Sequence, residues 1–301
     1  MTIIPYLQGG LGNQCFIYAA ARSLADLKSV TLTLDLRYLV ADFIYKRSFL
    51  LSNFNIRVEH IRDDVPLWVS RIQQMGYKVI SRYYGKIGGY YCEKSCPRHY
   101  QPLDFDEHRV KWVCLDGYWQ SEKYFCNNKT QIMRDLIVSN EQPFVGMTIS
   151  SQINRAHCPV FMHIRSYKEV TGREDGSAAL SVTYFRNALE KMKNMVGIFQ
   201  LFVFSDDVQW AMSRLHVPDG INTIYAEPSG KGQDFDTLRD FWLMRKCKHG
   251  IVANSSFSWW AGWLGEQDWL AKGETPIRMR VDKRCMNDDY WPDRWVAIPC
   301  E

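Results

Sequence analysis

Hydrophobic and polar positions follow one another along the first 35 residues in the order expected of a β-α-β unit. Residues 2–7 form a short apolar run typical of a buried strand, and residues 8–14 form a glycine-rich turn. Apolar positions then recur with a helical period over residues 15–28, and residues 30–35 form a second apolar run that ends in an aspartate. This order predicts two parallel strands joined by a crossover helix.

A second succession of the same kind occupies the last half of the chain. Short apolar runs predict strands at residues 160–164, 201–204, 224–226 and 250–253, and helical stretches fall at 181–195, 235–248 and 257–265. The middle of the chain is less regular, and residues 142–159 have the composition of a linker. We therefore expect an α/β fold of two doubly wound halves, 1–155 and 156–301, with ligands at the carboxyl ends of the strands.

The composition excludes several classes of protein. The 301 residues are 46% hydrophobic and carry a net charge of +4 without a dense run of Lys or Arg, so no nucleic-acid partner is expected. Weak attraction to an anionic membrane surface stays open. The sequence has no apolar stretch of about 18 residues, which excludes a membrane span, and its start lacks the features of a signal peptide.

Aromatic residues and cysteines add two further constraints. The 11 Trp and 16 Tyr would suit a sugar-binding cleft, although most such rings belong to the core. The nine cysteines are scattered and odd in number, which favours reduced thiols in the cytoplasm. Cys92 and Cys96 have a loose metal-like spacing, but no second pair and no His-x3-His accompany them, so no zinc site is expected.

The turn Gly9-Gly10-Leu11-Gly12-Asn13-Gln14 is the first candidate binding element. Glycines before a helix let a ligand approach the backbone and the unpaired N–H groups of the helix start. The spacing differs from the G-x-G-x-x-G of dinucleotide-binding folds, and no Lys follows Gly12 as in a P-loop. A tight turn in which Asn13 caps the helix is the structural alternative.

Polar side chains follow two strands of the second half. His163 and Arg165 lie two residues apart at the end of one strand, so they share a face, and an Arg in this place can fork onto phosphate oxygens. A paired structural arginine is the alternative. Asp206 and Asp207 follow the next strand and could bind a guanine edge, a ribose or a divalent cation, or could cap a helix.

The segment Asn254-Ser255-Ser256-Phe257-Ser258-Trp259-Trp260 follows the last of these strands. Hydroxyls and free N–H groups at the start of a helix form an anion site. We expect Trp259 and Trp260 to pack on the sheet rather than on a sugar.

Taken together, these segments resemble the α-1,2-fucosyltransferases of glycosyltransferase family 11. The matching pieces occur in the family's order over nearly the whole chain, and the glycine-rich opening and the closing Ser/Trp motif are specific. The pieces are residues 9–14 with Phe16, Tyr18 and Ala19, then 117–125, 163–165, 204–207, 247–254 and 255–260.

The resemblance implies a GT-B-like α/β fold, in which two Rossmann-like domains face each other across a cleft. Residues 1–155 would form the acceptor side and residues 156–301 would bind GDP-fucose. The implied reaction is an inverting transfer of L-fucose from GDP-fucose to the 2-hydroxyl of a galactose-containing glycan, without a metal or other cofactor. An enzyme of bacterial O-antigen synthesis is expected in the cytoplasm, and peripheral association with the inner face of the membrane stays open.

The resemblance also implies roles for single residues. Arg165 would hold the β-phosphate and offset charge as GDP departs. His163 and either Asp206 or Asp207 would lie near the guanosine. Further donor contacts are implied for Asn254, Ser255 and Ser256 and, in the opening loop, for Gly10, Gly12 and Asn13.

One departure from the family pattern falls beside Arg165. Family members usually carry His-x-Arg-Arg-x-Asp, whereas this chain has His163-Ile164-Arg165-Ser166-Tyr167-Lys168. Lys168 or Arg173 would have to supply the missing cation, and Glu169 the missing acid.

Catalysis is expected to involve Arg165, Asn13 and Asp35. Asp35 ends the second strand and Glu122 lies in segment 117–125, so either carboxylate could serve as the base, although an Asp that closes a strand is also a common cap. An oxocarbenium-like transition state needs little help from a base.

Three alternatives stay open on the sequence alone. The chain could be a fucosyltransferase of another linkage, such as α-1,6 or protein O-fucosylation. It could be a sugar-nucleotide-binding protein that has lost catalysis, given the altered run after Arg165. It could also transfer sugar with a metal ion held by its acidic pair.

Overall fold

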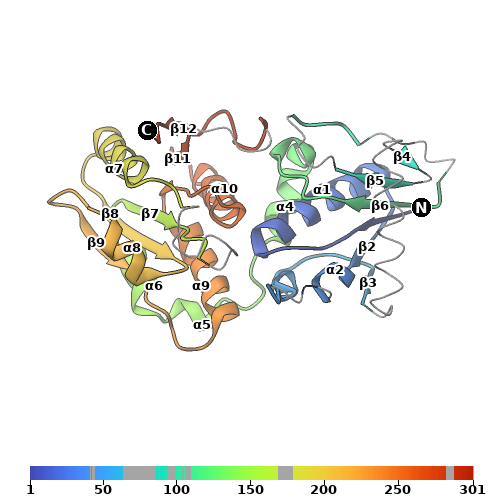
Figure 1. Ribbon diagram of the computed structural model, residues 1–301, viewed down its shortest axis with the longest axis horizontal. Coiled ribbons are helices and arrows are strands. Elements are labelled where there is room, and N and C mark those ends of the chain that lie inside the picture. The colour runs from blue at the N-terminus through green and yellow to red at the C-terminus, as the bar shows by residue number, and fades with distance from the viewer. Residues whose placement is uncertain are drawn as a thin grey trace. The chain divides into compact units, whose positions relative to one another are not determined.

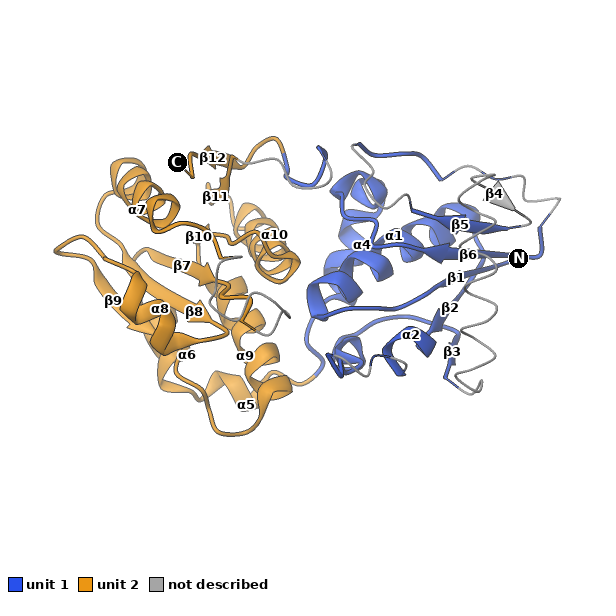
Figure 2. Cartoon of the chain, viewed as in Figure 1, with its two compact units in different colours: residues 1–139, 284–292 blue, residues 140–283, 293–301 orange. Residues whose placement is uncertain are grey.

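The computed structural model describes residues 1–40, 42, 45–63, 86–87, 89–93, 99–103, 105, 110–168, 179–282 and 288–300. The chain forms two compact units, one made of residues 1–139 and 284–292 and the other of residues 140–283 and 293–301 (Figure 2). Each unit is built on its own sheet (Figure 1).

The first unit contains strands β1 (Thr2–Pro5), β2 (Thr31–Asp35), β3 (His60–Arg62), β4 (Lys86–Ile87), β5 (Tyr90–Cys92) and β6 (Trp112–Asp116). Its helices are α1 (Leu11–Lys28), α2 (Arg37–Val40) and α4 (Lys129–Asp135), with 3-10 turns η1 (Leu50–Asn53), η2 (Glu122–Tyr124) and η3 (Cys126–Asn128). In the described part of this unit the strand order is β3-β2-β1-β6-β5-β4, and each neighbouring pair is parallel except β4 with β5.

The predicted opening β-α-β unit is confirmed. Strands β1 and β2 pair in parallel with Thr2 opposite Thr31, and α1 connects them. The helix begins at Leu11, earlier than the predicted Cys15, because Gly10 is its N-cap residue. Residues 14–25 of α1 are all buried, so the helix lies deep in the core of its unit.

The second unit contains strands β7 (Pro159–Ile164), β8 (Gln200–Ser205), β9 (Asn222–Tyr225), β10 (His249–Ile251), β11 (Arg278–Val281) and β12 (Val296–Ile298). Its helices are α5 (Gln142–Val145), α6 (Thr148–Arg155), α7 (Val182–Val196), α8 (Val208–Arg214), α9 (Gln233–Lys246) and α10 (Ser256–Leu270). The described strands lie in the order β12-β11-β10-β7-β8-β9, with every pair parallel.

Buried strands and tryptophans form the core of this second unit. All six residues of β7 are buried, as expected of a central strand covered on both faces. Trp259 and Trp260 of α10 are completely buried, and the ring of Trp259 stacks on that of Trp263 with centroids 6.2 Å apart. The prediction that Trp259 and Trp260 pack inside the protein is confirmed.

The predicted linker over residues 142–159 is wrong, because α5 and α6 occupy most of it. The ring of Phe144 in α5 packs against Phe235 and Trp242 of α9, with centroids 5.3 and 5.9 Å apart. These contacts attach the segment to α9, so the second compact unit begins at Asn140 and not at residue 156. None of the described helices is both long and apolar enough to cross a bilayer.

Candidate functional site

Three strands of the second sheet end at one edge, and the polar residues that follow them gather there. The strand order places β7 between β8 and β10, where the path of the chain across the sheet changes direction. Ligands of open parallel sheets bind at this point, beyond the carboxyl ends of the strands. Arg165, Asp206 and Asn254 follow β7, β8 and β10 by at most three residues.

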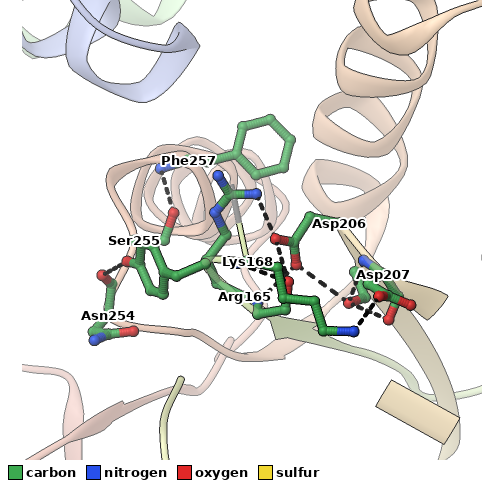
Figure 3. Close-up of polar contacts among 10 residues, drawn as sticks. Arg165, Lys168, Asp206, Asp207, Asn254, Ser255 and Phe257 are labelled. Atoms are coloured by element: carbon green, nitrogen blue, oxygen red, sulfur yellow. Dashed lines mark hydrogen bonds and ion pairs between the residues drawn. The ribbon is translucent and has the colours of Figure 1, made fainter. Parts of the chain in front are cut away.

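Arg165 is oriented by Asp206 (Figure 3). Its Nη1 lies 2.8 Å from Oδ2 of Asp206, and the arginine side chain is 20% exposed. The backbone N–H and the hydroxyl of Ser166 both donate to the same carboxylate at 2.7 Å. Ser166 occupies the place of the second Arg in the pattern His-x-Arg-Arg-x-Asp. A neutral residue therefore helps to fix the carboxylate of Asp206 here. The ion pair thus fixes the orientation of the guanidinium, while part of the arginine side chain stays accessible to solvent.

Asp207 is engaged with its own helix and with Lys168 (Figure 3). It is the N-cap of α8 and accepts the N–H of Trp210 at 2.9 Å, while its second oxygen lies 2.7 Å from Nζ of Lys168. The Lys168 hydrogen bond and then the Trp210 N–H lower the pKa of Asp207. The capping alternative therefore accounts for Asp207, and the charge of Lys168 is directed at that carboxylate.

Tyr167 connects the loop after β7 to the loop after β10. Its hydroxyl donates to the backbone carbonyl of Asn254 at 2.6 Å, and its ring centroid lies 5.3 Å from the guanidinium carbon of Arg165. The residue has a left-handed φ of 57°, which is uncommon for a side chain of this size. Sequence reasoning did not single out Tyr167, and its place between Arg165 and Lys168 was the available clue.

The start of α10 lies at the same edge. Ser255 is its N-cap and accepts the N–H of Phe257 at 3.4 Å, and Ser256 is the first helical residue. The helix is 15 residues long, so the N–H groups of its first turn carry the partial positive charge of a helix start. Such a turn favours an anion.

Two buried polar atoms at this edge have no hydrogen-bond partner among the described residues. They are Nδ1 of His163, whose residue is 4% exposed, and Oδ1 of Asn254. Burial lowers the pKa of His163 to about 3, so the ring is neutral at physiological pH. Because buried polar atoms normally have partners, this pair indicates a place for a ligand or an ordered water.

The conspicuous motifs of the first unit also meet, at the corresponding point of their own sheet between β1 and β6. The side-chain oxygen of Asn13 accepts a 2.9 Å hydrogen bond from Gln120, which joins the glycine-rich turn to segment 117–125. The N-cap of α1 is Gly10, without a side-chain bond, so the interpretation of Asn13 as the cap is wrong. Gly12 lies in the first turn of the helix.

Gly9 has a left-handed φ of 76°, and a Cβ there would lie 2.6 Å from Nδ2 of Asn13. This position therefore requires glycine for its conformation, and a larger residue would also displace the amide of Asn13.

Asp35 makes an ion pair inside the first unit. It has no exposed surface, and Nε of Arg37 lies 2.8 and 2.9 Å from its two carboxylate oxygens. Arg37 Nη2 adds a third contact at 2.5 Å. This geometry is that of a structural pair and does not favour Asp35 as a base.

Some sequence predictions fall outside the described residues, namely those on Cys96, Glu169 and Arg173. Within the described residues, no group of three or more His, Cys, Asp or Glu side chains is arranged to hold a metal ion.

Sequence reasoning also missed Glu93, whose carboxylate accepts backbone N–H groups from segment 117–125. Its only sequence clue was the three-residue strand β5 that precedes it.

Two bacterial proteins are related to this chain over most of its length. The chain is 27% identical over 305 residues to an α-1,2-colitosyltransferase of Escherichia coli, with 98% of each chain covered. It is 29% identical over 280 residues to the O-antigen biosynthesis glycosyltransferase WbnK of Escherichia coli, covering 86% of this chain and 88% of the relative.

The fold resembles that of the fucosyltransferase NodZ from Bradyrhizobium, solved as an α-1,6-fucosyltransferase soaked with GDP-fucose. The TM-score is 0.52 at 16% identity, over 86% of this chain and 91% of that one. The prediction of a GT-B-like α/β fold is confirmed. The model of glycosyl transferase family 11 matches residues 2–271, and the chain therefore belongs to this family of glycosyltransferases.

Proposed function

We propose that this chain is an inverting, metal-independent α-1,2-fucosyltransferase, which moves L-fucose from GDP-fucose to the 2-hydroxyl of a galactose-containing glycan. One observation carries the proposal. At the carboxyl edge of the second sheet, Arg165 is partly exposed and held by Asp206, close in the fold to the start of α10 and to two buried polar atoms without partners.

The charge of this edge suits a diphosphate. GDP must leave the sugar with its negative charge developed, and a guanidinium together with helix N–H groups offsets that charge without a metal. Arg165 would bind the β-phosphate, and the hydroxyls of Ser255 and Ser256 with the first turn of α10 would bind the remaining oxygens. The acceptor oxygen would attack the anomeric carbon from the face opposite GDP, which converts a β-linked donor into an α-linked product.

The neutral ring of His163 and the amide of Asn254 would face the guanosine, since each has a buried atom that needs a partner. Asp206 supports Arg165, and Asp207 is satisfied by its cap and by Lys168, so their guanosine contacts stay predictions. Donor contacts by Gly10, Gly12 and Asn13 also stay predictions, and the bond to Gln120 fixes the amide of Asn13.

A galactose-containing glycan of bacterial O-antigen is the acceptor we propose, in line with the activity named for the related WbnK. The enzyme would then work in the cytoplasm, with or without peripheral contact to the membrane. The test is incubation with GDP-fucose and a panel of galactosides in the presence of EDTA, followed by linkage analysis. An α-1,2-fucosylated product supports the proposal, and an α-1,6 product, activity restored only by Mn²⁺, or GDP binding without transfer would contradict it.

A colitosyl donor is the second candidate, because one relative over nearly the whole chain is named an α-1,2-colitosyltransferase. A GDP-linked colitose would differ from GDP-fucose in the sugar alone, so the site around Arg165 would suit either donor. Competition between GDP-fucose and GDP-colitose for one galactoside, with products separated by mass, decides between them.

A further inference from the structure

The carboxyl edge of the first sheet carries a half-buried carboxylate, Glu93, directly after β5. Its backbone N–H donates to the carbonyl of Asp116 at 2.8 Å, which extends the pairing of β5 with β6 by one residue. Its Oε2 accepts two backbone N–H groups of the following loop, from Tyr118 at 2.5 Å and Trp119 at 3.0 Å. The carboxylate is therefore anchored by main chain at the carboxyl edge of the sheet, one strand away from the point between β1 and β6 where ligands of such sheets bind.

The loop after β6, which begins at Gly117, packs closely against the side chain of Glu93. A Cβ on Gly117 would lie 2.3 Å from Cβ of Glu93 and 2.7 Å from Oε2, so a larger residue would push the loop away. Trp119 has a left-handed φ of 55°. A backbone held in this sparsely populated region is typical of functional sites.

The same loop bears two features that suit a sugar. Tyr118 is 39% exposed, and the apolar face of a pyranose packs on an exposed aromatic ring. The buried Nε1–H of Trp119 has no hydrogen-bond partner among the described residues, although the residue is only 4% exposed. An indole donor without a partner indicates a water or hydroxyl that is part of the complete site.

Electrostatics favour a proton acceptor in this place. Burial raises the pKa of Glu93, the two backbone N–H groups lower it, and nearby Asp116 raises it. Among the described residues, Tyr118 and Tyr124 also interact with Glu93, and their own pKa values are raised mainly by burial. A carboxyl whose pKa lies above its ordinary value is a better base near neutral pH.

We propose that Glu93 is the general base for the acceptor hydroxyl and that Tyr118 and Trp119 belong to the acceptor sugar subsite; this rests on the proposed function. The acceptor O–H bond breaks and its proton passes to the carboxylate of Glu93. The oxygen forms the new bond to the anomeric carbon, whose bond to the phosphate oxygen breaks with its electron pair going to GDP. Glu93 then returns the proton to solvent.

Glu93→Gln is the decisive variant, because it keeps the size of the side chain and an oxygen for the Tyr118 and Trp119 N–H groups. We expect kcat to fall by about a hundredfold or more, with acceptor KM and GDP affinity within about threefold of wild type. The acidic limb of the pH profile of kcat/KM, where wild-type Glu93 becomes protonated, should disappear.

A matched control exists at the opposite end of the same sheet. The exposed carboxylate of Glu59 accepts one backbone N–H, that of Leu32 at 2.6 Å, so Glu59→Gln makes the same chemical change at a backbone-bonded carboxylate and should keep wild-type kcat. If Glu93→Gln does not fold, Glu93→Asp replaces it: withdrawing the carboxylate by one methylene should lower kcat about tenfold and shift the acidic limb. Wild-type kcat in either folded variant overturns the inference.

Trp119→Phe tests the subsite, because it removes only the unpartnered N–H and part of the ring. Acceptor KM should rise about fivefold, roughly one lost hydrogen bond, with GDP affinity unchanged, and an unchanged KM would overturn the subsite. Saturation-transfer NMR with a β-galactoside reports binding without turnover. If the wild-type enzyme transfers fucose to no galactoside, the proposed function is contradicted. The saturation-transfer signal of the galactoside, present or absent, then still supports or overturns the subsite.

Discussion

Both units carry polar residues at the carboxyl edge of their sheets, but the side chains at the two edges differ in chemistry. In the second unit, the edge presents a guanidinium held by Asp206 and the start of the long helix α10. In the first unit, the helix that starts at this edge has Gly10 as its N-cap, and the loop after β6 holds the carboxylate of Glu93. Under the two proposals above, the edge with Arg165 would bind the diphosphate and the edge with Glu93 would take a proton from the acceptor hydroxyl.

This difference shows that the topology of the sheet sets where a site lies, whereas the residues of the loops set its chemistry. The strand order changes direction between β7 and β10 in one sheet and between β1 and β6 in the other, and Glu93 follows β5, the strand next to β6. The residue that follows the strand would decide the outcome: under the proposed function Arg165 after β7 binds phosphate, and Glu93 after β5 takes the proton of the acceptor hydroxyl. Variants at each edge should therefore affect different substrates.

The largest effect is expected on stability, from the buried pair of Asp35 and Arg37 in the first unit. Arg37→Ala leaves a carboxylate without exposed surface and without its cation, which should lower the free energy of unfolding by about 3–5 kcal/mol. Urea denaturation measures the loss. Arg57→Ala is the control, since Arg57 is 58% exposed beside Asp135 and its pair should contribute at most about 1 kcal/mol. A small loss for Arg37→Ala would restore Asp35 as a candidate base.

The second effect is on turnover at the anion-binding edge. Arg165→Ala should lower kcat/KM for GDP-fucose by about a hundredfold or more, or on the order of 3 kcal/mol in barrier, because the full positive charge of the guanidinium is lost from the departing GDP. Arg165→Lys should recover little, since an ammonium lacks the fork that fits a phosphate. Steady-state kinetics measure both, with the exposed Arg186→Ala of α7 as control. Near-normal turnover in Arg165→Ala would refute the donor site.

The third effect is a pH dependence that belongs to the second unit. The pKa of His163 is lowered to about 3 by burial, so its contribution to stability is complete above pH 6.5 and is lost as pH falls toward 3. Between pH 7 and pH 5 the loss should be about 2 kcal/mol. His249, whose pKa is lowered to about 4, adds a loss of the same sign.

His163→Gln should remove its share of this slope, and thermal unfolding at both pH values measures it. His216, on the exposed surface, is the control. An unchanged slope in His163→Gln would mean that the buried ring is not neutral as described.

Much of the fold was predictable from the sequence, because buried parallel strands are nearly continuous apolar runs. The run at 160–164 became β7, and the Ser/Trp motif became the N-cap of α10 followed by buried tryptophans. The segment 142–159 was misjudged because Pro143 indicates a turn, whereas proline is also tolerated in the first turn of a helix such as α5.

The cluster of polar residues around Arg165 was largely predictable from the sequence, and the surroundings of Glu93 were not. Arg165, Asp206 and Asn254 each directly follow a recognisable strand, so their meeting follows from topology. Glu93 follows a strand of only three residues, and its partners are backbone atoms 25 and 26 positions away. Asp35 looked free because its partner Arg37 is two residues on, and no sequence pattern shows that both side chains turn inward.

The smallest effect should come from one methyl group at the hydroxyl-binding edge. The Cβ of Gly117→Ala would meet the Cβ of Glu93 at 2.3 Å, and that atom cannot move aside as the end of a flexible chain could. The loop must shift, so the hydrogen bonds from Tyr118 and Trp119 should lengthen and kcat should fall about tenfold, on the order of 1.4 kcal/mol. GDP affinity, measured by calorimetry, should not change, because the residues proposed to bind the diphosphate, Arg165, Ser255 and Ser256, belong to the other unit. Gly146→Ala is the control, since nothing lies within 4 Å of its added Cβ. A Gly117→Ala variant that lost GDP affinity and kept kcat would reverse the roles assigned to the two edges.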